Sequence, residues 1–301
     1  MAVNTVKAII NGNTYNLTYN STIQKWEATV TAPGSSSYPL AGHYYPVTIQ
    51  ATDAAGNVTT KDSKDASIGS SLRLTVKEKV APTISITAPT SGAMLVNNKP
   101  TITWTVSDND SGVDPATIKL TIDSTAITSG ITKTAAGKGY NCSYAPTSTL
   151  ADGSHTIKFD ASDYDGNAAS QKSVIFKVDT VPPTLAVSSP ADGFITNVAD
   201  VTVDGTTNDA TTSPVTLTIK LNSETAQTVT VESDGSFSKV LTLVSGTNTI
   251  TVTATDGAGK SSTITRTAVL DQVPPSITAI TLAPNPVDAG ATYIISVSVT
   301  D

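Results

Sequence analysis

The stretch HTIKFDASDYDGNAAS, residues 155–170, carries the pattern that decides the fold. Apolar and polar residues alternate up to Asp163, a glycine-containing turn follows, and a second extended run begins. Alternation with a period of two is typical of a half-buried β-strand. Asp, Gly and Asn tolerate the positive φ angles of tight hairpin turns. The stretch therefore predicts a β-hairpin whose first strand packs one face against a core.

The same hairpin pattern occurs three times in the chain. YPVTIQATDAAGNVTT covers 45–60 and NTITVTATDGAGKSST covers 248–263, and the three aspartates that begin the turns are 110 and 93 residues apart. A second marker recurs with spacings of 101 and 92 residues: VAPTISITAP (80–89), VPPTLAVSSP (181–190) and VPPSITAITLAP (273–284). Two independent markers with a period near 100 residues indicate tandem domains.

Each complete repeat contains about seven short alternating strands separated by turn signals. This pattern is typical of an Ig-like β-sandwich, and Trp104, between Ile102 and Val106, is expected to point into its core. Proline pairs at 182–183 and 274–275 indicate stiff, short linkers. The predicted divisions are an N-terminal unit lacking its first two strands (1–79), two complete domains (80–180 and 181–272) and a two-strand C-terminal segment (273–301).

The repeated motifs resemble those of a known group of proteins. VPPxxxxxxP openings and ATDxxGN hairpins are similar to the Ig-like repeats of surface adhesins and of phage virion and tail proteins in Gram-positive bacteria and their phages. NPVDAGATYIISVSVTD (285–301) resembles the first two strands of such modules. The resemblance implies an all-β fold of tandem Ig-like sandwiches. It implies a structural or adhesive role only weakly, because this fold carries many functions.

The two ends of the chain carry complementary parts of one repeat. Residues 273–301 align with the first two strands, and NTVKAIIN (4–11) aligns with the third strand, ATIKLTID (116–123). We expect 273–301 of one copy to complete 1–79 of another by donor-strand-like complementation, building a filament or a ring head to tail. The residues expected to carry this self-assembly are Tyr293, Ile295, Val297, Val299, Ile277, Ile280, Val6 and Ile10.

Three other interpretations of the C-terminal segment stay open at this point. It could be a free tail, it could pair with a different protein, or the chain could have been trimmed. A trimmed chain is the weakest of these, because the proline linkers are the natural place to cut.

Composition restricts the partners and the location. The formal net charge is −7 and the pI about 4.8, with no basic stripe, so nucleic-acid binding is not expected. The first residues show no signal peptide, and no segment has the roughly 20 apolar residues of a membrane span. These features favour a phage virion component released by lysis. The alternative is a secreted or cell-surface adhesin or filament subunit. Expected partners are other copies, virion proteins and a host-surface glycan.

Residues suited to catalysis are sparse. The chain has two histidines, His43 and His155, and one cysteine, Cys142. Cys142 and His155 share a repeat, but no third residue beside them suggests a triad. We therefore expect no enzyme, and we interpret Cys142 as an ordinary strand residue that cannot form an intrachain disulfide.

Two acidic clusters and one group of aromatic residues are candidate binding sites. SDNDSGVD (107–114) and DASDYDGN (160–167) provide closely spaced oxygens of the kind that calcium prefers. The candidate calcium ligands are Asp108, Asp110, Asp114, Asp160, Asp163 and Asp165. Plain hairpin turns are the competing interpretation, because the sibling turns at 53–57 and 256–260 lack most of the carboxylates.

The candidate glycan-binding residues are Trp26, Tyr44 and Tyr45, in the aromatic-rich N-terminal unit. Packing within that unit is the competing interpretation.

Overall fold

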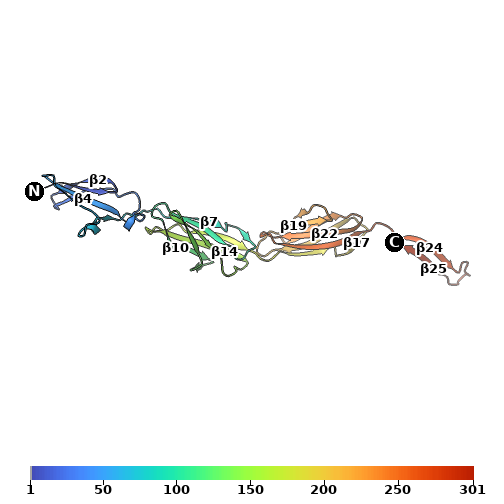
Figure 1. Cartoon of the computed structure of the whole chain (residues 1–301). Helices are drawn as coiled ribbons and strands as arrows, with labels where there is room; N and C mark the ends of the chain where they lie inside the picture. Colours follow the sequence, from blue (N-terminus) through green and yellow to red (C-terminus); the bar gives the residue numbers. More distant parts are fainter. Residues whose placement is uncertain (1) are drawn as a thin grey trace. The chain divides into compact units, whose positions relative to one another are not determined.

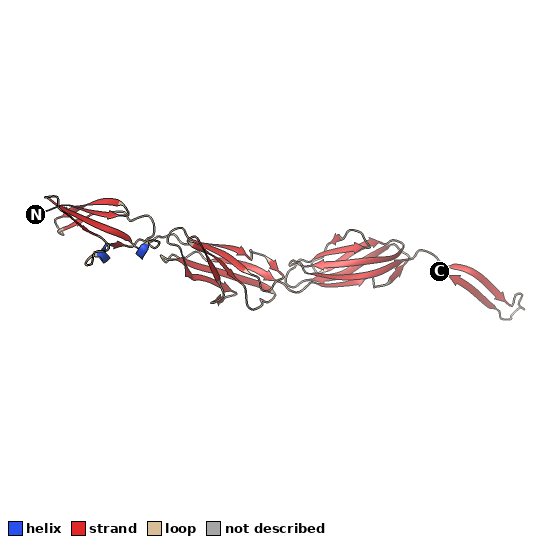
Figure 2. Ribbon diagram, viewed as in Figure 1, coloured by secondary structure: helices blue, strands red, loops and turns tan. Residues whose placement is uncertain are grey.

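Strands account for almost all the regular structure of the chain (Figures 1 and 2). The structure is a computed structural model and describes residues 2–301. Its only helices within this range are two short 3-10 turns, η1 (Ala41–His43) and η2 (Gly69–Leu72), drawn in blue in Figure 2. The chain divides into two compact units, Met1–Val178 and Asp179–Asp301, and each is described by itself.

Unit 1 begins with a single sheet whose strand order is β3-β2-β1-β4-β5, with β6 pairing with β4. Its strands are β1 (Val3–Ile10), β2 (Asn13–Asn20), β3 (Lys25–Glu27), β4 (Tyr45–Asp53), β5 (Val58–Lys61) and β6 (Arg73–Leu74). Residues 28–33, between β3 and β4, form no strand. No second sheet among residues 2–79 faces this one, so we call it the open sheet.

The rest of unit 1 is a sandwich of two sheets, which we call the first sandwich. One sheet has the order β11-β10-β14-β15-β8 and the other β12-β13-β9-β7. The strands are β7 (Thr83–Ala88), β8 (Met94–Leu95), β9 (Ile102–Ser107), β10 (Val113–Ile122), β11 (Thr125–Ile127), β12 (Thr132–Ala136), β13 (Gly139–Tyr144), β14 (Gly153–Asp163) and β15 (Lys172–Val178). Trp104 is 1% exposed and packs against Phe159 of the facing sheet, which confirms its predicted place in the core.

Unit 2 begins with a second sandwich of the same kind. Its sheets have the orders β16-β18-β21 and β17-β23-β22-β19-β20. The strands are β16 (Thr184–Ser189), β17 (Phe194–Thr196), β18 (Asp200–Asn208), β19 (Thr216–Leu221), β20 (Gln227–Val229), β21 (Ser236–Thr242), β22 (Gly246–Thr255) and β23 (Ser261–Leu270). Inward side chains alternate with outward polar ones along each long strand, because successive residues of a strand point to opposite faces.

Unit 2 ends with a hairpin of two strands, β24 (Ser276–Ala283) and β25 (Ile294–Thr300). These strands pair only with one another, and every residue of both is exposed. The hairpin is coloured red at the end of the chain in Figure 1.

Strand order relates the open sheet to the two sandwiches. The orders β2-β1-β4-β5, β11-β10-β14-β15 and β20-β19-β22-β23 are the same series of antiparallel neighbours. The middle strands β4, β14 and β22 lead into turns with the same hydrogen bonds, in which Asp53, Asp163 and Asp256 each accept from a glycine three residues later. The predicted fold class, all-β with tandem Ig-like sandwiches and incomplete terminal parts, is confirmed.

Candidate functional sites: two uncovered apolar faces and an acidic trio

The open sheet presents core-type side chains on a face that no second sheet covers. Val47, Ile49 and Ala51 of β4 are only half-buried. The corresponding residues of the two sandwiches, which lie two, four and six residues before the turn aspartate, are at most 3% exposed: Ile157, Phe159, Ala161, Ile250, Val252 and Ala254. The same strand pattern thus lacks its cover in the open sheet.

A small cavity of about 270 Å³ lies on this face of the open sheet. Ile10 and Val47, which pair across β1 and β4, line it together with Leu74 and residues 30–33. Val6 and Ile10, two of the predicted assembly residues, are themselves buried at 8% and 9% exposure. The face is therefore partly filled by the 28–33 segment and keeps an apolar opening beside it.

The hairpin has the complementary property, an apolar face that nothing in the described chain covers. Ile277 pairs with Val299 and Ile280 pairs with Val297, and opposite residues of an antiparallel pair share one face. The six predicted assembly residues of this region are 49–63% exposed: Tyr293, Ile295, Val297, Val299, Ile277 and Ile280. Isolated two-stranded hairpins are marginal in water, because they cannot bury such a face alone.

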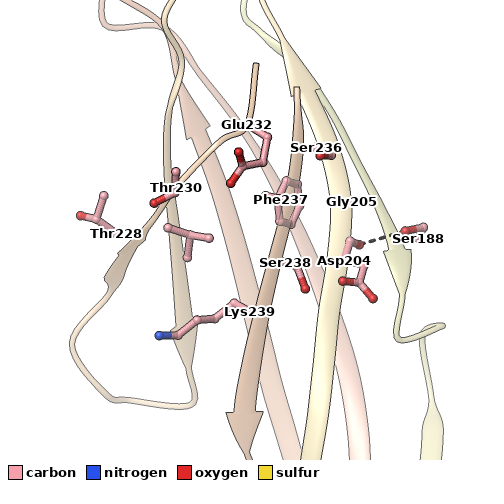
Figure 3. Close-up of a pocket in the computed structure, with 11 residues that line it drawn as sticks. Ser188, Asp204, Gly205, Thr228, Thr230, Glu232, Ser236, Phe237, Ser238 and Lys239 are labelled. Carbon is pink, nitrogen blue, oxygen red and sulfur yellow. Dashed lines mark hydrogen bonds between the residues drawn. The ribbon is translucent and has the colours of Figure 1, made fainter. Parts of the chain in front are cut away.

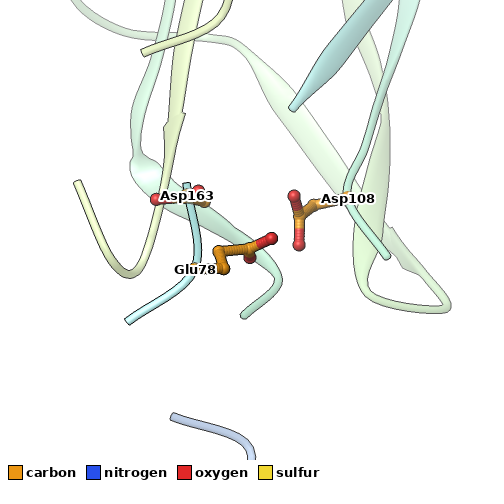
Figure 4. A group of neighbouring side chains, drawn as sticks. All are labelled: Glu78, Asp108 and Asp163. Atoms are coloured by element: carbon orange, nitrogen blue, oxygen red, sulfur yellow. The ribbon is translucent and has the colours of Figure 1, made fainter. Parts of the chain in front are cut away.

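Three carboxylates from distant parts of unit 1 meet at one end of the first sandwich. They are Glu78, Asp108 and Asp163, which we call the unit 1 trio, and Figure 4 shows the Glu78 carboxylate lying between the other two. Each offers one oxygen within 4.8 Å of the others. Asp108 follows β9, Asp163 ends β14, and Glu78 precedes β7, so strand ends of both sheets position the group.

Backbone hydrogen bonds hold the unit 1 trio in place. Asp108 Oδ1 accepts from the Asp110 and Gly112 amides at 2.9 and 2.8 Å. Asp163 accepts from the backbone and side-chain amides of Asn167 at 2.8 and 2.7 Å.

The remaining member of the trio is held by a similar contact. Glu78 Oε1 accepts from the Ser111 amide at 2.6 Å. Burial is nearly complete for Asp108 (7% exposed) and Asp163 (2%). Closely spaced, buried oxygens of this kind suit a hard divalent cation.

The structure brings together two of the six aspartates that were predicted as calcium ligands, Asp108 and Asp163. Asp165 and Asp110 accept from the amides of Glu78 and Ser36, both at the junction with the open sheet.

The other two lie elsewhere. Asp114 accepts from the Ala116 amide, and Asp160 accepts from the Gln171 side chain. Glu78 was missed by the sequence analysis. The available signal was its position two residues before Val80, which Asp179 and Asp271 share relative to Val181 and Val273.

The three predicted glycan-binding rings do not form one exposed surface. Tyr45 is buried at 6% exposure, and its hydroxyl donates to the Ser35 carbonyl at 3.2 Å. Trp26 packs against Tyr19, with ring centroids 5.6 Å apart, and Arg73 lies over the Tyr44 ring. Packing within the open sheet thus uses part of each of these rings.

His155 has a structural arrangement rather than a catalytic one. Its Nδ1 lies 2.6 Å from Asp123 Oδ2 and its Nε2 lies 2.7 Å from the Ala151 carbonyl oxygen. Desolvation of the ring lowers the pKa of His155, but the bond to Ala151 and the contact with Asp123 outweigh it, so the pKa is raised overall. Burial raises the pKa of the Cys142 thiol to about 11, which leaves it protonated and unreactive at neutral pH.

A surface pocket of about 550 Å³ lies on the β16-β18-β21 sheet of the second sandwich (Figure 3). Five of its eleven lining residues are Ser or Thr, and Lys239, Glu232 and Asp204 are the charged ones. Figure 3 shows the Lys239 side chain directed away from Asp204. The lining contains neither His nor Cys, and its charged groups do not converge on one point.

Comparisons with known proteins agree with this architecture. Residues 82–158 match the family described as bacterial Ig domain, and residues 183–272 match the family described as glucodextranase, domain B. A search of curated proteins found no match.

Solved structures with similar folds include fibronectin(III)-like modules of Clostridium thermocellum CbhA. They are 16% identical, the similarity covers 63% of this chain and 94% of theirs, and the TM-score is 0.37. A second is the I67–I69 I-band fragment of titin, at 14% identity, covering 88% of this chain and 87% of that one, with a TM-score of 0.43. A third is the Sidekick-1 immunoglobulin domains 1–4, at 12% identity, covering 88% and 67%, with a TM-score of 0.39.

Within residues 2–301 no helix has the length and apolar character needed to cross a bilayer. Tandem bacterial Ig-like domains are typical of proteins with a structural or adhesive role. From its strand topology and the two family matches, the chain consists of tandem Ig-like domains similar to those of bacterial Ig-like repeat proteins.

Proposed function

We propose that this protein is a non-enzymatic structural or adhesive protein whose copies join head to tail. In each joint, β24 and β25 of one copy supply the two strands that the open sheet of the next copy lacks. The observation that carries the proposal is that each of the two regions has an apolar face that is not covered. The open sheet has an apolar face without a facing sheet, and the hairpin has an apolar face without a cover.

The register of the hairpin supports its role as the missing pair of strands. Ile277 pairs with Val299 in the hairpin, and Ile84 pairs with Val106 at the matching place in the first sandwich. Ile84 and Val106 are 3% and 1% exposed, whereas the hairpin pair is more than half exposed. Covering each large side chain contributes about 1.5–3 kcal/mol, from which the cost of ordering the joint is subtracted.

Residues 28–33, ATVTAP, offer the incoming hairpin a backbone partner. In the first sandwich β9 pairs with β7 on one side and with β13 on the other. In the second, β18 pairs with β16 on one side and with β21 on the other. The 28–33 segment occupies the matching point in chain order, between β1 and β4, and has no strand partner. It also lines the cavity beside Ile10 and Val47. Addition of β25 to this segment would satisfy unpaired backbone groups on both sides.

Light scattering tests the joint directly. The full chain is expected to give a ladder of masses, a filament or a closed ring, and a variant ending at Gln272 is expected to stay monomeric. Val297→Asp places a charge on the apolar face of β25 and should abolish the ladder. Ser298→Asp, one residue along and on the opposite face, is the matched control and should leave it intact.

Two results would overturn this model of assembly. One is a full chain that stays monomeric at concentrations of tens of micromolar. The other is a ladder that Val297→Asp and Ser298→Asp weaken equally. A hairpin that prefers a different protein would give the first result, together with binding of that protein to the full chain but not to the chain ending at Gln272.

The setting that we propose for this assembly is a phage particle, as a tail or head appendage. The resemblance of the VPP and ATDxxGN motifs to virion proteins supports it, and the same motifs in surface adhesins make a cell-surface filament the second candidate. Cosedimentation of the protein with purified particles would support the first setting. Recovery from washed cell surfaces, with none on particles, would replace it with the second.

A further inference from the structure

Three aspartates converge in the second sandwich, and none of them was among the predicted calcium ligands. Asp179 precedes β16, Asp209 directly follows β18, and Asp256 directly follows β22. We call them the unit 2 trio. Each offers an oxygen within 4.8 Å of the other two, and they are 0%, 8% and 6% exposed. Two oxygens that each lie about 2.4 Å from one calcium ion can be at most about 4.8 Å apart, so this spacing fits a shared cation.

One oxygen of the unit 2 trio has no partner. Asp256 Oδ1 accepts from the Lys260 amide at 2.8 Å, but Asp256 Oδ2 is buried and accepts no hydrogen bond. The other two carboxylates are held, because Asp179 accepts from the Val181 amide and Asp209 accepts from the Thr212 amide. A buried carboxylate oxygen without a donor is costly, and its presence in a fixed group points to a missing ligand.

Charge gives the same indication. Neither the ion pair between Lys61 and Asp65 nor that between His155 and Asp123 includes the unit 2 trio. Three like charges withdrawn from water at this spacing repel one another unless a cation lies among them. We propose that the unit 2 trio binds a divalent cation, for which calcium is the best match because all the ligands are hard oxygens.

The same three positions are occupied in unit 1. Glu78 precedes β7, Asp108 directly follows β9 and Asp163 ends β14. In each trio one member thus lies directly after the third strand of its sandwich. Here too a polar atom is left over, since the hydroxyl of Ser111, which is 4% exposed, has no partner. Ser111 lies three residues after Asp108, as Thr212 lies three residues after Asp209. The recurrence is what a repeated binding site requires.

A third set of these positions is divided between the two ends of the chain. Asp271 accepts from the Val273 amide at 3.0 Å, the contact that Asp179 makes with the Val181 amide at 3.1 Å. Asp301 directly follows β25, the counterpart of β18.

The remaining member of this set is Asp53. It accepts from the Asn57 amide at 2.9 Å, as Asp256 does from the Lys260 amide. Resting on the head-to-tail joint proposed above, Asp271 and Asp301 of one copy would therefore meet Asp53 of the next. This third cation site exists only when copies join, so calcium should promote assembly.

Metal content and thermal unfolding test the unit 2 trio. The assembly-blocked Val297→Asp chain, stripped with EDTA and returned to calcium, is expected to retain two calcium ions per chain. Adding Asp256→Asn should reduce this to one, and Asp204→Asn, the same change outside the trio, should not. At a hundredfold excess over Kd, calcium should raise the unfolding temperature of the second sandwich by more than about 5 °C.

Unfolding temperatures compared in calcium and in EDTA distinguish a cation site from a merely structural role of Asp256. In calcium, Asp256→Asn should unfold at a lower temperature than the chain that keeps Asp256. In EDTA the order should be equal or reversed, because the substitution removes one of three repelling charges. Absence of bound calcium, or a variant that is less stable by the same amount in both buffers, would overturn the proposal.

Light scattering in calcium and in EDTA then tests the shared site in the full chain. Calcium should shift the mass ladder upward, and Asp53→Asn should remove that shift while two calcium ions per chain remain. An equal ladder in both buffers would exclude the shared site and leave strand complementation standing. No ladder in either buffer would exclude complementation, and the unit 2 trio would still be judged by its metal content.

Discussion

The middle strand of the open sheet and the middle strand of the first sandwich differ in what surrounds them, not in local structure. β4 lies between β1 and β5, and β14 lies between the equivalent strands β10 and β15. Both β4 and β14 end in an aspartate whose side chain accepts from the backbone amide of an asparagine four residues later. Ile49 of β4 is half-buried, whereas Phe159, at the same place in β14, is fully buried. Strand, turn and register are therefore local properties, whereas burial depends on a second sheet.

Truncating a core residue should separate the two regions most strongly. Ile157→Ala in β14 removes a fully buried side chain and is expected to cost about 2–5 kcal/mol in the free energy of unfolding. Ile49→Ala in β4 makes the same chemical change at a half-buried site and should cost less than half as much in the unassembled chain ending at Gln272. Denaturant unfolding measures both, and equal costs would show that the open sheet already has a complete core.

Substitution of the turn glycine should affect the two regions alike. Gly166 and Gly56 have φ angles of +93° and +90°, and a Cβ at either position would meet no atom within 4 Å. Alanine at either site is therefore strained by its backbone alone and should destabilise the region that carries it by about 1–2 kcal/mol. Denaturant titration of the two variants should give costs within experimental error of each other. A large difference would mean that the turns are not equivalent.

A pH titration should distinguish the first sandwich through His155. Because its pKa is raised in the folded state, the group contributes stability that is fully present below about pH 6.5 and is lost as the pH rises through the folded pKa. His155→Gln should therefore lose more stability at pH 5.5 than at pH 8.5. A pH-independent loss would contradict the assignment.

The rate of thiol labelling at Cys142 should report how often the first sandwich opens, without changing the stability of that sandwich. Cys142 is 4% exposed and its pKa is raised to about 11, so its thiolate is scarce at pH 8. Iodoacetamide should modify the native chain at least about a hundredfold more slowly than the unfolded chain at that pH. In Ile157→Ala the labelling rate should rise with the population of the opened sandwich, and in Ile49→Ala it should not.

Much of the architecture follows from patterns a few residues long. Period-two alternation predicts the long strands, and the Asp-x-x-Gly turns predict the hairpins, because both depend on the pleat and on local φ angles. Trp104 was placed in the core by its neighbours in sequence, and the structure confirms it. Tyr45 shows the limit of such reasoning. Adjacent to Tyr44 in sequence, it was grouped with a surface, yet its ring is buried.

The acidic trios show the same limit for the candidate sites. Asp108 and Asp163 stand in acidic runs that a sequence search notices, but Asp110 and Asp165 stand in the same runs and serve other contacts. Glu78 stands alone, thirty residues before Asp108. Which carboxylates share a point in space depends on how the strand ends of two sheets stack, and spacing along the chain does not encode that.

Alternation and turn chemistry act over a few residues, so the amino-acid sequence is enough to predict the strands, the turns, the repeat and the complementary patterns at the two ends. Which faces are covered and which carboxylates meet depends on the tertiary structure. Burial of β14 needs β9 and β13 across the sandwich, and the unit 2 trio needs three loops from separate strands. These are non-local consequences of sheet packing, and they are where the functional proposals for this protein arise.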